Sequence, residues 1–317
     1  MARYLITGGA GFIGSNMTDE LLRRGEDVGV LDNLATGREE NLAGVRDRIS
    51  FHKTDFRNLD QVRPAFEGMD YVIHLGALPS VPRSISDPIT SNAVNIDGTL
   101  NVLMAARDAK VKRVVFAASS SAYGDNPVLP RVETHEPRPL SPYALTKLTG
   151  EYYCRIFTQL YGLETVALRY FNIFGPRQNP DSPYTGVLSL FIAAYLRGQT
   201  PTIFGDGEQS RDFTYVDNAV DATLRACNAP AASGRVINVG AGDRNTLNNV
   251  IEKLNKIFGR SVTPKYGPAR LGDVRESHAD IRLAQELLGY RPLVTFEEGL
   301  QRTIEWNRAS LGKPTAG

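Results

Sequence analysis

Two segments of the chain carry residues whose types and spacing suit redox chemistry at a bound nucleotide. The first runs from Tyr4 to Gly14 and places glycines after a short apolar run. The second contains Tyr143 and Lys147, four residues apart. A glycine-rich turn between a strand and a helix holds phosphates at the helix N-terminus, and a tyrosine with a lysine on the same helix face can move a proton. Together they predict a nicotinamide cofactor with an acid/base group beside it.

The glycine segment is typical of a dinucleotide site. Gly8 would make the tight turn, Gly11 would let the backbone approach the pyrophosphate, and Gly14 would let the helix pack on the sheet. Asp32 ends the second predicted strand, where its carboxylate can accept hydrogen bonds from ribose hydroxyls and repel a 2′-phosphate. NAD is therefore favoured, and Arg38 keeps NADP open as the alternative because a guanidinium can bind that phosphate.

The acid/base pair depends on its surroundings. A free tyrosine has a pKa of about 10, and a nearby ammonium and an oxidised nicotinamide both favour the phenolate. Lys147 can also hold the ribose of the nicotinamide nucleotide. Ser119, Ser120 and Ser121 follow the fifth predicted strand, at the end where open α/β sheets bind ligands. The alternatives are a solvated helix face for Tyr143 and Lys147, and a polar turn for the serines.

Short β-branched runs alternate with helical patterns in the first half, which predicts an α/β fold with a doubly wound parallel Rossmann sheet. Beyond Gly175 the pattern changes to a smaller substrate-binding α/β lobe. Residues 213–216 and 236–239 again look like sheet strands, so we expect interleaved lobes: residues 1–169 with 212–240 bind NAD, and residues 170–211 with 241–317 bind a nucleotide sugar. The first six predicted strands contain residues 4–6, 28–31, 49–51, 71–73, 113–116 and 166–170.

Helices are expected over residues 12–24 and 60–66, after Pro88, and from Ser141, which is a good N-cap before a proline. The composition excludes other classes. The chain has 317 residues, 42% of them hydrophobic, and a formal charge of +1, which favours neither nucleic acid nor an anionic membrane as a partner. No membrane span, signal peptide, disulfide framework or metal site is expected, and the two cysteines predict packed thiols in a cytoplasmic protein.

With these residues in place, the chain resembles the extended short-chain dehydrogenase/reductase family, and within it the UDP-hexose 4-epimerases that accept N-acetylated sugars. The similarity runs over nearly the whole length. Its markers are residues 7–14, 32–34, 55–56, 74–77, 119–124, 143–147, 168–172, 210–213 and 272–274.

The resemblance implies a cofactor site. Asp55 and Phe56 would hold the adenine, and Phe171 would lie near the nicotinamide. Asn95 matches a helix asparagine of the family, with a packing role as the alternative. The full predicted set for NAD is Gly8, Gly11, Phe12, Ile13, Gly14, Asp32, Asn33, Asp55, Phe56, Leu75, Ala77, Asn95, Tyr143, Lys147 and Phe171.

The resemblance also implies a UDP-sugar site. Two arginines suit the pyrophosphate, an aspartate suits the ribose hydroxyls, Asn172 can donate to a phosphate oxygen, and residues 202 and 204 would border the uracil. The predicted set is Ser80, Ser119, Ser120, Ser121, Tyr143, Asn172, Gln178, Val187, Phe191, Thr202, Phe204, Arg211, Arg270, Asp273 and Ser277.

In the reaction that the resemblance implies, Tyr143 takes the proton of the C4 hydroxyl, and Ser119 relays that proton or polarises the hydroxyl. NAD takes a hydride from C4, which leaves a transient 4-keto sugar, and then returns it. Ser277 leaves room for a 2-acetamido group and Gln178 offers it an amide. We therefore expect interconversion of UDP-GlcNAc and UDP-GalNAc, with UDP-glucose and UDP-galactose accepted too, by a homodimer built on helices after Pro88 and Ser141.

Of three alternatives, the sequence argues against a dehydratase and a regulatory module and leaves a uronate-converting enzyme open. A 4,6-dehydratase would need an acidic pair where this chain has Ser120 and Ser121. A UDP-glucuronate 4-epimerase or a decarboxylase would need a cation for the sugar carboxylate, which Arg83 or Arg177 could supply. An NAD-binding regulatory module without turnover would need the glycine turn but not the Tyr143–Lys147 pair.

Overall fold

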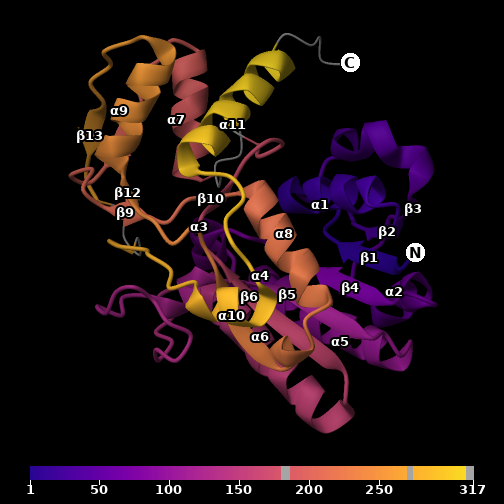
Figure 1. Cartoon of the computed structure of the whole chain (residues 1–317). Helices are drawn as coiled ribbons and strands as arrows, with labels where there is room; N and C mark the ends of the chain where they lie inside the picture. The colour runs from indigo at the N-terminus through magenta and orange to yellow at the C-terminus, as the bar shows by residue number, and fades with distance from the viewer. Residues whose placement is uncertain (180–185, 270–273, 312–317) are drawn as a thin grey trace.

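The computed structural model describes residues 1–179, 186–269 and 274–311, and its centre is a seven-stranded sheet (Figure 1). All strand pairs in this sheet are parallel. The order is β11-β6-β5-β4-β1-β2-β3, so the chain starts in the middle and winds outward in both directions. The strands are β1 (Arg3–Thr7), β2 (Asp27–Leu31), β3 (Ser50–His52), β4 (Tyr71–His74), β5 (Arg113–Ser119), β6 (Glu164–Tyr170) and β11 (Arg235–Val239).

Helices cover both faces of this sheet, because its inner strands are apolar on both sides. Ile6 belongs to the core that includes α1 and α8, and its neighbour Leu5 belongs to the core that includes α2, α5 and α6. The helices of these two layers are α1 (Phe12–Arg23), α2 (Leu59–Phe66), α5 (Gly98–Asp108), α6 (Pro142–Tyr161) and α8 (Val216–Cys227). The predicted doubly wound parallel fold is confirmed.

The connections carry shorter elements. Ser141 caps α6 as predicted, because its hydroxyl accepts from the Ala144 N–H at 3.2 Å. The helical segment after Pro88 is continuous but contains a π-helical turn. The short elements are η1 (Glu39–Arg48), α3 (Val81–Ser86), α4 (Pro88–Asn92), η2 (Ala93–Asp97), η3 (Ser120–Tyr123) and η4 (Pro230–Ala232).

One predicted strand lies elsewhere. β11 joins the central sheet as expected, but residues 214–215 pair in parallel with residues 173–174 outside it. The segment is apolar for another reason: Phe213 and Tyr215 pack with Phe174 and Phe296 in an aromatic cluster, and α8 begins at Val216. Residues 213–216 were predicted to look like a sheet strand. Residues 214–215 do form a strand, but that strand lies outside the central sheet.

A smaller part of the molecule lies beside the sheet, where α7 and α9 stand together at the upper left of Figure 1. The division at residues 170, 212 and 241 stays a prediction, and α10 packs on β11 and α8 of the larger part. The remaining elements are β7 (Ile173–Phe174), α7 (Val187–Leu196), β8 (Thr202–Phe204), β9 (Ser210–Arg211), β10 (Thr214–Tyr215), β12 (Asn245–Thr246), α9 (Leu247–Phe258), β13 (Lys265–Gly267), α10 (Arg282–Leu288) and α11 (Phe296–Leu311).

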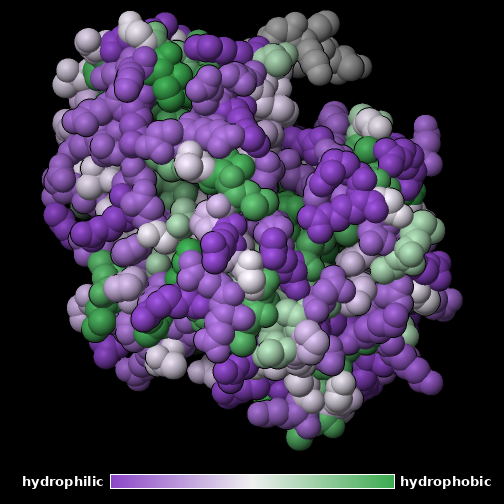
Figure 2. Space-filling view, viewed as in Figure 1, coloured by the Kyte–Doolittle hydropathy of each residue, from purple (hydrophilic) through white to green (hydrophobic). Residues whose placement is uncertain are grey.

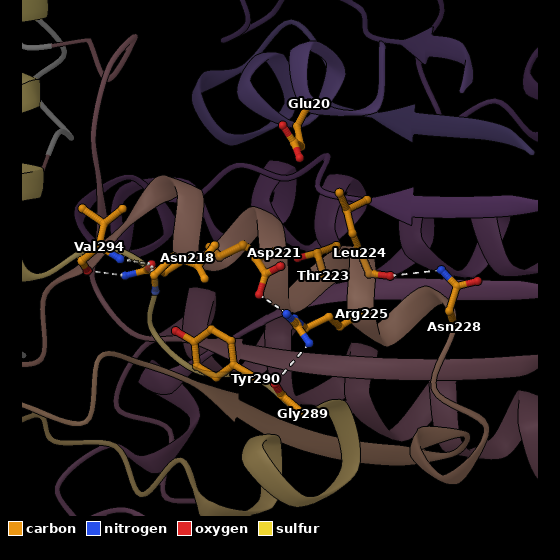
Figure 3. A network of polar contacts seen from close by, with 12 residues as sticks. Glu20, Asn218, Asp221, Thr223, Leu224, Arg225, Asn228, Gly289, Tyr290 and Val294 are labelled. Atoms are coloured by element: carbon orange, nitrogen blue, oxygen red, sulfur yellow. Dashed lines mark hydrogen bonds and ion pairs between the residues drawn. The ribbon is translucent and has the colours of Figure 1, made fainter. Parts of the chain in front are cut away.

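Polar side chains of α8 attach the C-terminal segment to this frame (Figure 3). The Asn218 amide oxygen accepts from the Val294 N–H at 2.9 Å, and its nitrogen donates to the Val294 carbonyl at 2.8 Å. Two turns further on, Arg225 pairs with Asp221 at 2.6 Å and donates to the Gly289 carbonyl at 3.1 Å. These bonds join the segment after α10 to α8, a helix that packs on the central sheet.

The surface in Figure 2 is mostly hydrophilic, with small separate hydrophobic areas. Within the described ranges, no helix has the length and apolar character needed to cross a membrane. Cys154 and Cys227 are both free and buried. Burial raises the pKa of the Cys227 thiol to about 12, so this group is a packed, unreactive thiol at neutral pH.

A buried ion pair joins α6 to β6. The Glu151 carboxylate accepts two hydrogen bonds from the Arg169 guanidinium, at 2.8 and 2.7 Å, and both side chains are only 3% exposed. The guanidinium also lies 4.4 Å from the centre of the Tyr123 ring. Two charges this deeply buried stay stable only together, because each one alone would lose its hydration without compensation.

We therefore predict that Glu151→Ala lowers the free energy of unfolding by about 3–5 kcal/mol, since it leaves the Arg169 charge buried and unpaired. Chemical denaturation measures this change. The matched control is Glu298→Gln, which breaks a 2.6 Å pair with Arg302 whose side chains are nearly half exposed. That control should change stability by less than about 1 kcal/mol. Equal effects of the two variants would contradict the assigned role of the buried pair.

Candidate functional site

The glycine turn after β1 has the geometry of a phosphate cradle. Gly8 has φ +72°, and a Cβ there would lie 2.7 Å from the Gly76 nitrogen. A Cβ on Gly14 would lie 2.3 Å from the Gly8 carbonyl oxygen, so α1 can approach the turn only with glycine here. Gly11 caps α1 without a side-chain hydrogen bond, which leaves the first N–H groups of the helix open to a ligand.

Asp32 completes the predicted adenosine side of this turn. Its carboxylate accepts from the Ala10 N–H at 3.0 Å and from the Leu34 N–H at 2.8 Å, and burial raises its pKa above the usual range. A Cβ on Gly37 would lie 2.8 Å from the same carboxylate, so the loop after β2 folds closely over Asp32. The residues present fit a dinucleotide: the open helix N-terminus suits its pyrophosphate and the carboxylate suits ribose hydroxyls.

The residues predicted to hold adenine are partly engaged within the protein. Asp55 accepts from Arg57 at 2.7 Å and from Asn33 at 2.9 Å, and the Arg57 hydrogen bonds lower its pKa. Phe56 is buried and makes an edge contact with the ring of His74 at 5.6 Å. Their adenine-binding roles stay predictions. The structure places both residues next to the loop that carries Asn33.

A cavity of about 420 Å³ lies at the carboxyl ends of β4, β5 and β6. This is the edge of an open α/β sheet where ligands bind. Residues far apart in the sequence meet here, and twelve of its lining residues belong to the predicted site: Ile13, Leu75, Ala77, Ser119, Ser120, Ser121, Tyr143, Lys147, Phe171, Asn172, Arg211 and Ser277.

Tyr143 and Ser119 both line this cavity. Burial raises the pKa of the Tyr143 phenol above its usual range, and a hydrogen bond with the Ser119 side chain acts in the opposite direction. The Ser119 hydroxyl in turn accepts from the Ser121 hydroxyl at 2.8 Å. Ser84 fixes the start of α6, because its hydroxyl accepts from the Tyr143 N–H at 3.0 Å.

Lys147 lies one turn further along α6. Its ammonium donates to the Ala117 carbonyl at 2.8 Å and lies 4.9 Å from the centre of the Phe116 ring. Burial lowers its pKa to about 8, because a desolvated ammonium is unstable. In the protein alone, burial is the largest influence on the pKa of the Tyr143 phenol.

Other predicted residues point their polar atoms into the protein instead of lining this cavity. The Ser80 hydroxyl caps α3 by accepting from the Arg83 N–H at 3.1 Å. The Asn95 amide accepts from the Leu78 N–H at 2.8 Å and donates to Thr146 at 3.1 Å. Asn95 therefore has the packing contacts that the sequence left open as its alternative role.

The residues predicted to border the uracil and the sugar also lie apart from one another. Gln178 accepts from Ser189 at 2.6 Å, and Phe191 is 2% exposed in the hydrophobic core. Val187 begins α7, while Thr202 and Phe204 are exposed on β8. Arg270 and Asp273 lie outside the described residues.

The two arginines considered for a sugar carboxylate are not among the residues that line the cavity. Arg177 pairs with Asp19 on α1 at 2.6 Å. Arg83 lies on α3 and contributes its N–H to the Ser80 cap.

The sequence missed several lining residues, including Tyr123, Arg131, Leu140 and Glu276. Tyr123 belongs to segment 119–124, one of the markers of the family resemblance, and this marker could have identified it. Arg131 belongs to no recognisable sequence motif. It reaches the cavity because its backbone bridges in parallel to Ala279, from a distant part of the chain.

Comparison with known proteins agrees with this geometry. Residues 4–240 match the model of the NAD dependent epimerase/dehydratase family. The chain is 40% identical to a UDP-glucose 4-epimerase of Mycolicibacterium smegmatis over 96% of this chain and 98% of that protein.

Two solved structures are similarly close. The UDP-glucose 4-epimerase of Thermotoga maritima with UDP-glucose has a TM-score of 0.93 at 40% identity. The UDP-N-acetylglucosamine 4-epimerase of Methanobrevibacter ruminantium in complex with UDP-N-acetylmuramic acid has a TM-score of 0.93 at 39% identity. Each alignment covers 98% of this chain and 99% of the other. The chain is a member of the NAD dependent epimerase/dehydratase family.

The close approach at Gly14 gives a test of the cofactor site. We predict that Gly14→Ala reduces the NAD that copurifies with the protein and destabilises the fold by about 1–3 kcal/mol, because the new methyl group pushes α1 away from the turn. Nucleotide released on denaturation and the free energy of unfolding are the measurements. Gly44→Ala is the control, because nothing lies within 4 Å of a Cβ there. Normal NAD content in Gly14→Ala would contradict the cradle.

Proposed function

We propose that this protein is an NAD-dependent epimerase that inverts C4 of a UDP-sugar through a transient 4-keto sugar. The main support is that Tyr143 and Ser119 line the same cavity, with Lys147 one helical turn away on its wall. The two structures compared above, both named as UDP-sugar 4-epimerases, share this fold over almost the whole chain. A regulatory module that only binds NAD would not need this arrangement.

The chain's own residues divide the proton work. Tyr143 takes the proton from the sugar O4 hydroxyl and later returns it, while Ser119 polarises that hydroxyl and Ser121 orients Ser119 through their 2.8 Å bond. Lys147 stabilises the phenolate and the nicotinamide ribose. The glycine turn, the α1 N-terminus and Asp32 would hold NAD. When bound, NAD supplies reversible hydride acceptance.

A dehydratase is less well supported, although it belongs to the same broad family. Its elimination step needs further acid/base groups beside the catalytic hydroxyl. Here Ser120 and Ser121 occupy those positions, and the Ser121 hydroxyl is used to donate to Ser119. An unactivated hydroxyl is a weak general acid at neutral pH.

Acetylated sugars are our proposed principal substrates. The Asn172 side chain donates to the Ser277 hydroxyl at 3.3 Å and to the Asp212 carbonyl at 3.1 Å, which fixes a small residue on the cavity wall. A serine leaves space beside the sugar that a bulky side chain would fill. Arg211 lines the same cavity and is the guanidinium proposed for the pyrophosphate.

The decisive experiment incubates purified protein, without added cofactor, with UDP-GlcNAc, UDP-glucose and UDP-glucuronate separately and identifies the products by NMR. We expect C4 epimers, with UDP-GlcNAc converted best. Tyr143→Phe should lower turnover by roughly 10²- to 10⁴-fold while NAD stays bound, because only the transferable proton is removed. No product from any sugar, or full turnover in Tyr143→Phe, would refute the proposed function.

We also propose a homodimer. Support comes from apolar side chains that α6 leaves exposed: Leu145, Tyr152 and Ile156 are each 40% exposed or more. The adjoining α3 and α4 add Ile85 and Ile89. Exposed apolar side chains gathered on neighbouring helices are typical of an interface. A cytoplasmic location is likewise our proposal, supported by the two free buried thiols.

Sedimentation velocity tests the dimer. The 34.8 kDa chain should sediment as a dimer, and Ile156→Glu should produce monomers because it places a charge in the apolar contact. Leu293→Glu is the matched control, since that leucine is 61% exposed far from α6 in sequence and outside the proposed surface. A monomeric wild-type protein would be contrary to the proposal.

A further inference from the structure

Arg131 is held firmly at the cavity wall by its backbone. Its N–H donates to the His278 carbonyl at 2.8 Å, and its carbonyl accepts from the Asp280 N–H at 2.9 Å and from the Asn238 side chain at 2.8 Å. Two of these bonds fasten the loop between β5 and α6 to the segment that follows Ser277, and the third fastens it to β11. The side chain therefore starts from a fixed point beside the proposed sugar site.

The Arg131 side chain is unusual for its charge. The residue is only 4% exposed, yet it lines the cavity. One guanidinium nitrogen donates to the Val128 carbonyl at 2.8 Å, and no carboxylate of the described residues lies within ion-pair distance. A guanidinium has five N–H donors, so most of them remain for a ligand. Burial lowers the pKa of Arg131 below its usual range, which reflects the cost of burying the charge without an ionic partner.

Glu276 supplies the opposite kind of group on the same cavity wall. It precedes Ser277 and also lines the cavity. Its carboxylate is 46% exposed and approaches Arg244 at 3.6 Å. The Glu276 charge acts on Arg131 and raises the arginine's pKa, so the two groups are near enough to interact electrostatically. The wall beside Ser277 therefore combines a strong donor with a strong acceptor.

This combination suits one type of sugar substituent. An acetamido group has one carbonyl oxygen that accepts and one N–H that donates, and it carries no net charge. An anionic substituent at this place would meet Arg131 but also the like charge of Glu276. A plain hydroxyl would use only part of the donor set.

We propose that Arg131 and Glu276 are specificity-determining residues that recognise the 2-acetamido group of the substrate, Arg131 by donating to its carbonyl oxygen and Glu276 by accepting from its N–H. The inference rests on the proposed function, because it needs the sugar to occupy this cavity. It adds two polar contacts to the space that Ser277 leaves open.

The test compares sugars in variants of the NAD-bound enzyme. Arg131→Met should raise KM for UDP-GlcNAc on the order of tenfold, the usual effect of losing one charged hydrogen bond. KM for UDP-glucose and the Kd of UDP should stay within about twofold, because neither ligand has the acetamido group. Arg131→Lys should raise KM for UDP-GlcNAc by less than Arg131→Met does. Glu276→Gln should raise KM for UDP-GlcNAc with little effect on KM for UDP-glucose, which has no N–H to lose a hydrogen bond.

Arg138→Met is the matched control, since Arg138 lies on the same loop with its side chain 52% exposed. It should leave all three constants unchanged. NAD content and the unfolding transition show whether each variant is folded, and Arg131→Lys carries the test if Arg131→Met is not.

The outcomes separate this inference from the proposed function. Equal losses for UDP-GlcNAc and UDP-glucose, no loss for UDP-GlcNAc, or a selective loss of UDP-glucuronate would overturn the inference. A wild-type enzyme that converts UDP-glucose but does not bind UDP-GlcNAc would overturn it too, and would leave C4 epimerisation standing. A wild-type protein that converts no UDP-sugar would refute the proposed function itself.

Discussion

The buried pair between Glu151 and Arg169 holds α6, the helix that carries Tyr143 and Lys147, against the sheet. Tyr143, Lys147 and Glu151 are spaced four residues apart on α6, so they share one face of the helix. The far end of that face is tied to β6 by two short charged hydrogen bonds. Any sliding or rotation of α6 would separate two charges that have no water around them. The position of the phenol over the cavity therefore depends on an ion pair two turns away.

Other charges near the cavity are stabilised differently. Lys147 relies on a carbonyl and an aromatic ring, Arg131 on a carbonyl, and Asp32 on two backbone N–H groups. None of these partners neutralises the charge. A site with partly compensated charges is suited to ligands that bring their own charges and hydrogen-bonding groups, such as a dinucleotide and a nucleotide sugar. A charge that is paired with an opposite charge inside the protein is thus structural, whereas a charge without such a partner is available to a ligand.

Asp212 joins the two sides of the cavity. Its carboxylate accepts from the backbone N–H groups of Ala241, Gly242 and Ala279, at 2.7 to 3.1 Å. Burial raises its pKa to about 6, although the three N–H donors favour the ionised form. Through these bonds the residue next to Arg211 fixes both the end of β11 and the segment after Ser277. The walls proposed for pyrophosphate and sugar therefore move as one unit.

Much of the larger part of this protein was determined by local sequence. Alternating apolar runs predicted the strands, because a parallel sheet covered on both faces needs continuous apolar segments, and the Ser141-Pro142 pair marked the start of α6. The glycine turn, Asp32, Ser119 and Tyr143 could be found because their chemistry depends on short, fixed spacings. Thr214 and Tyr215 were harder to place, since an apolar segment can serve an aromatic cluster as well as a sheet.

Only the tertiary structure brought Arg131 to Glu276 and Ser277 and gave Glu151 its partner. Arg131 reaches the cavity through backbone bonds to residues 278 and 280, and no local pattern records a pairing between loops so far apart. Likewise, the sequence offered the Ser80 hydroxyl and the Asn95 amide as binding groups, whereas folding used both in hydrogen bonds within the protein. A residue's type sets which bonds it can make. Which of them it makes is decided by the neighbours that long-range packing supplies.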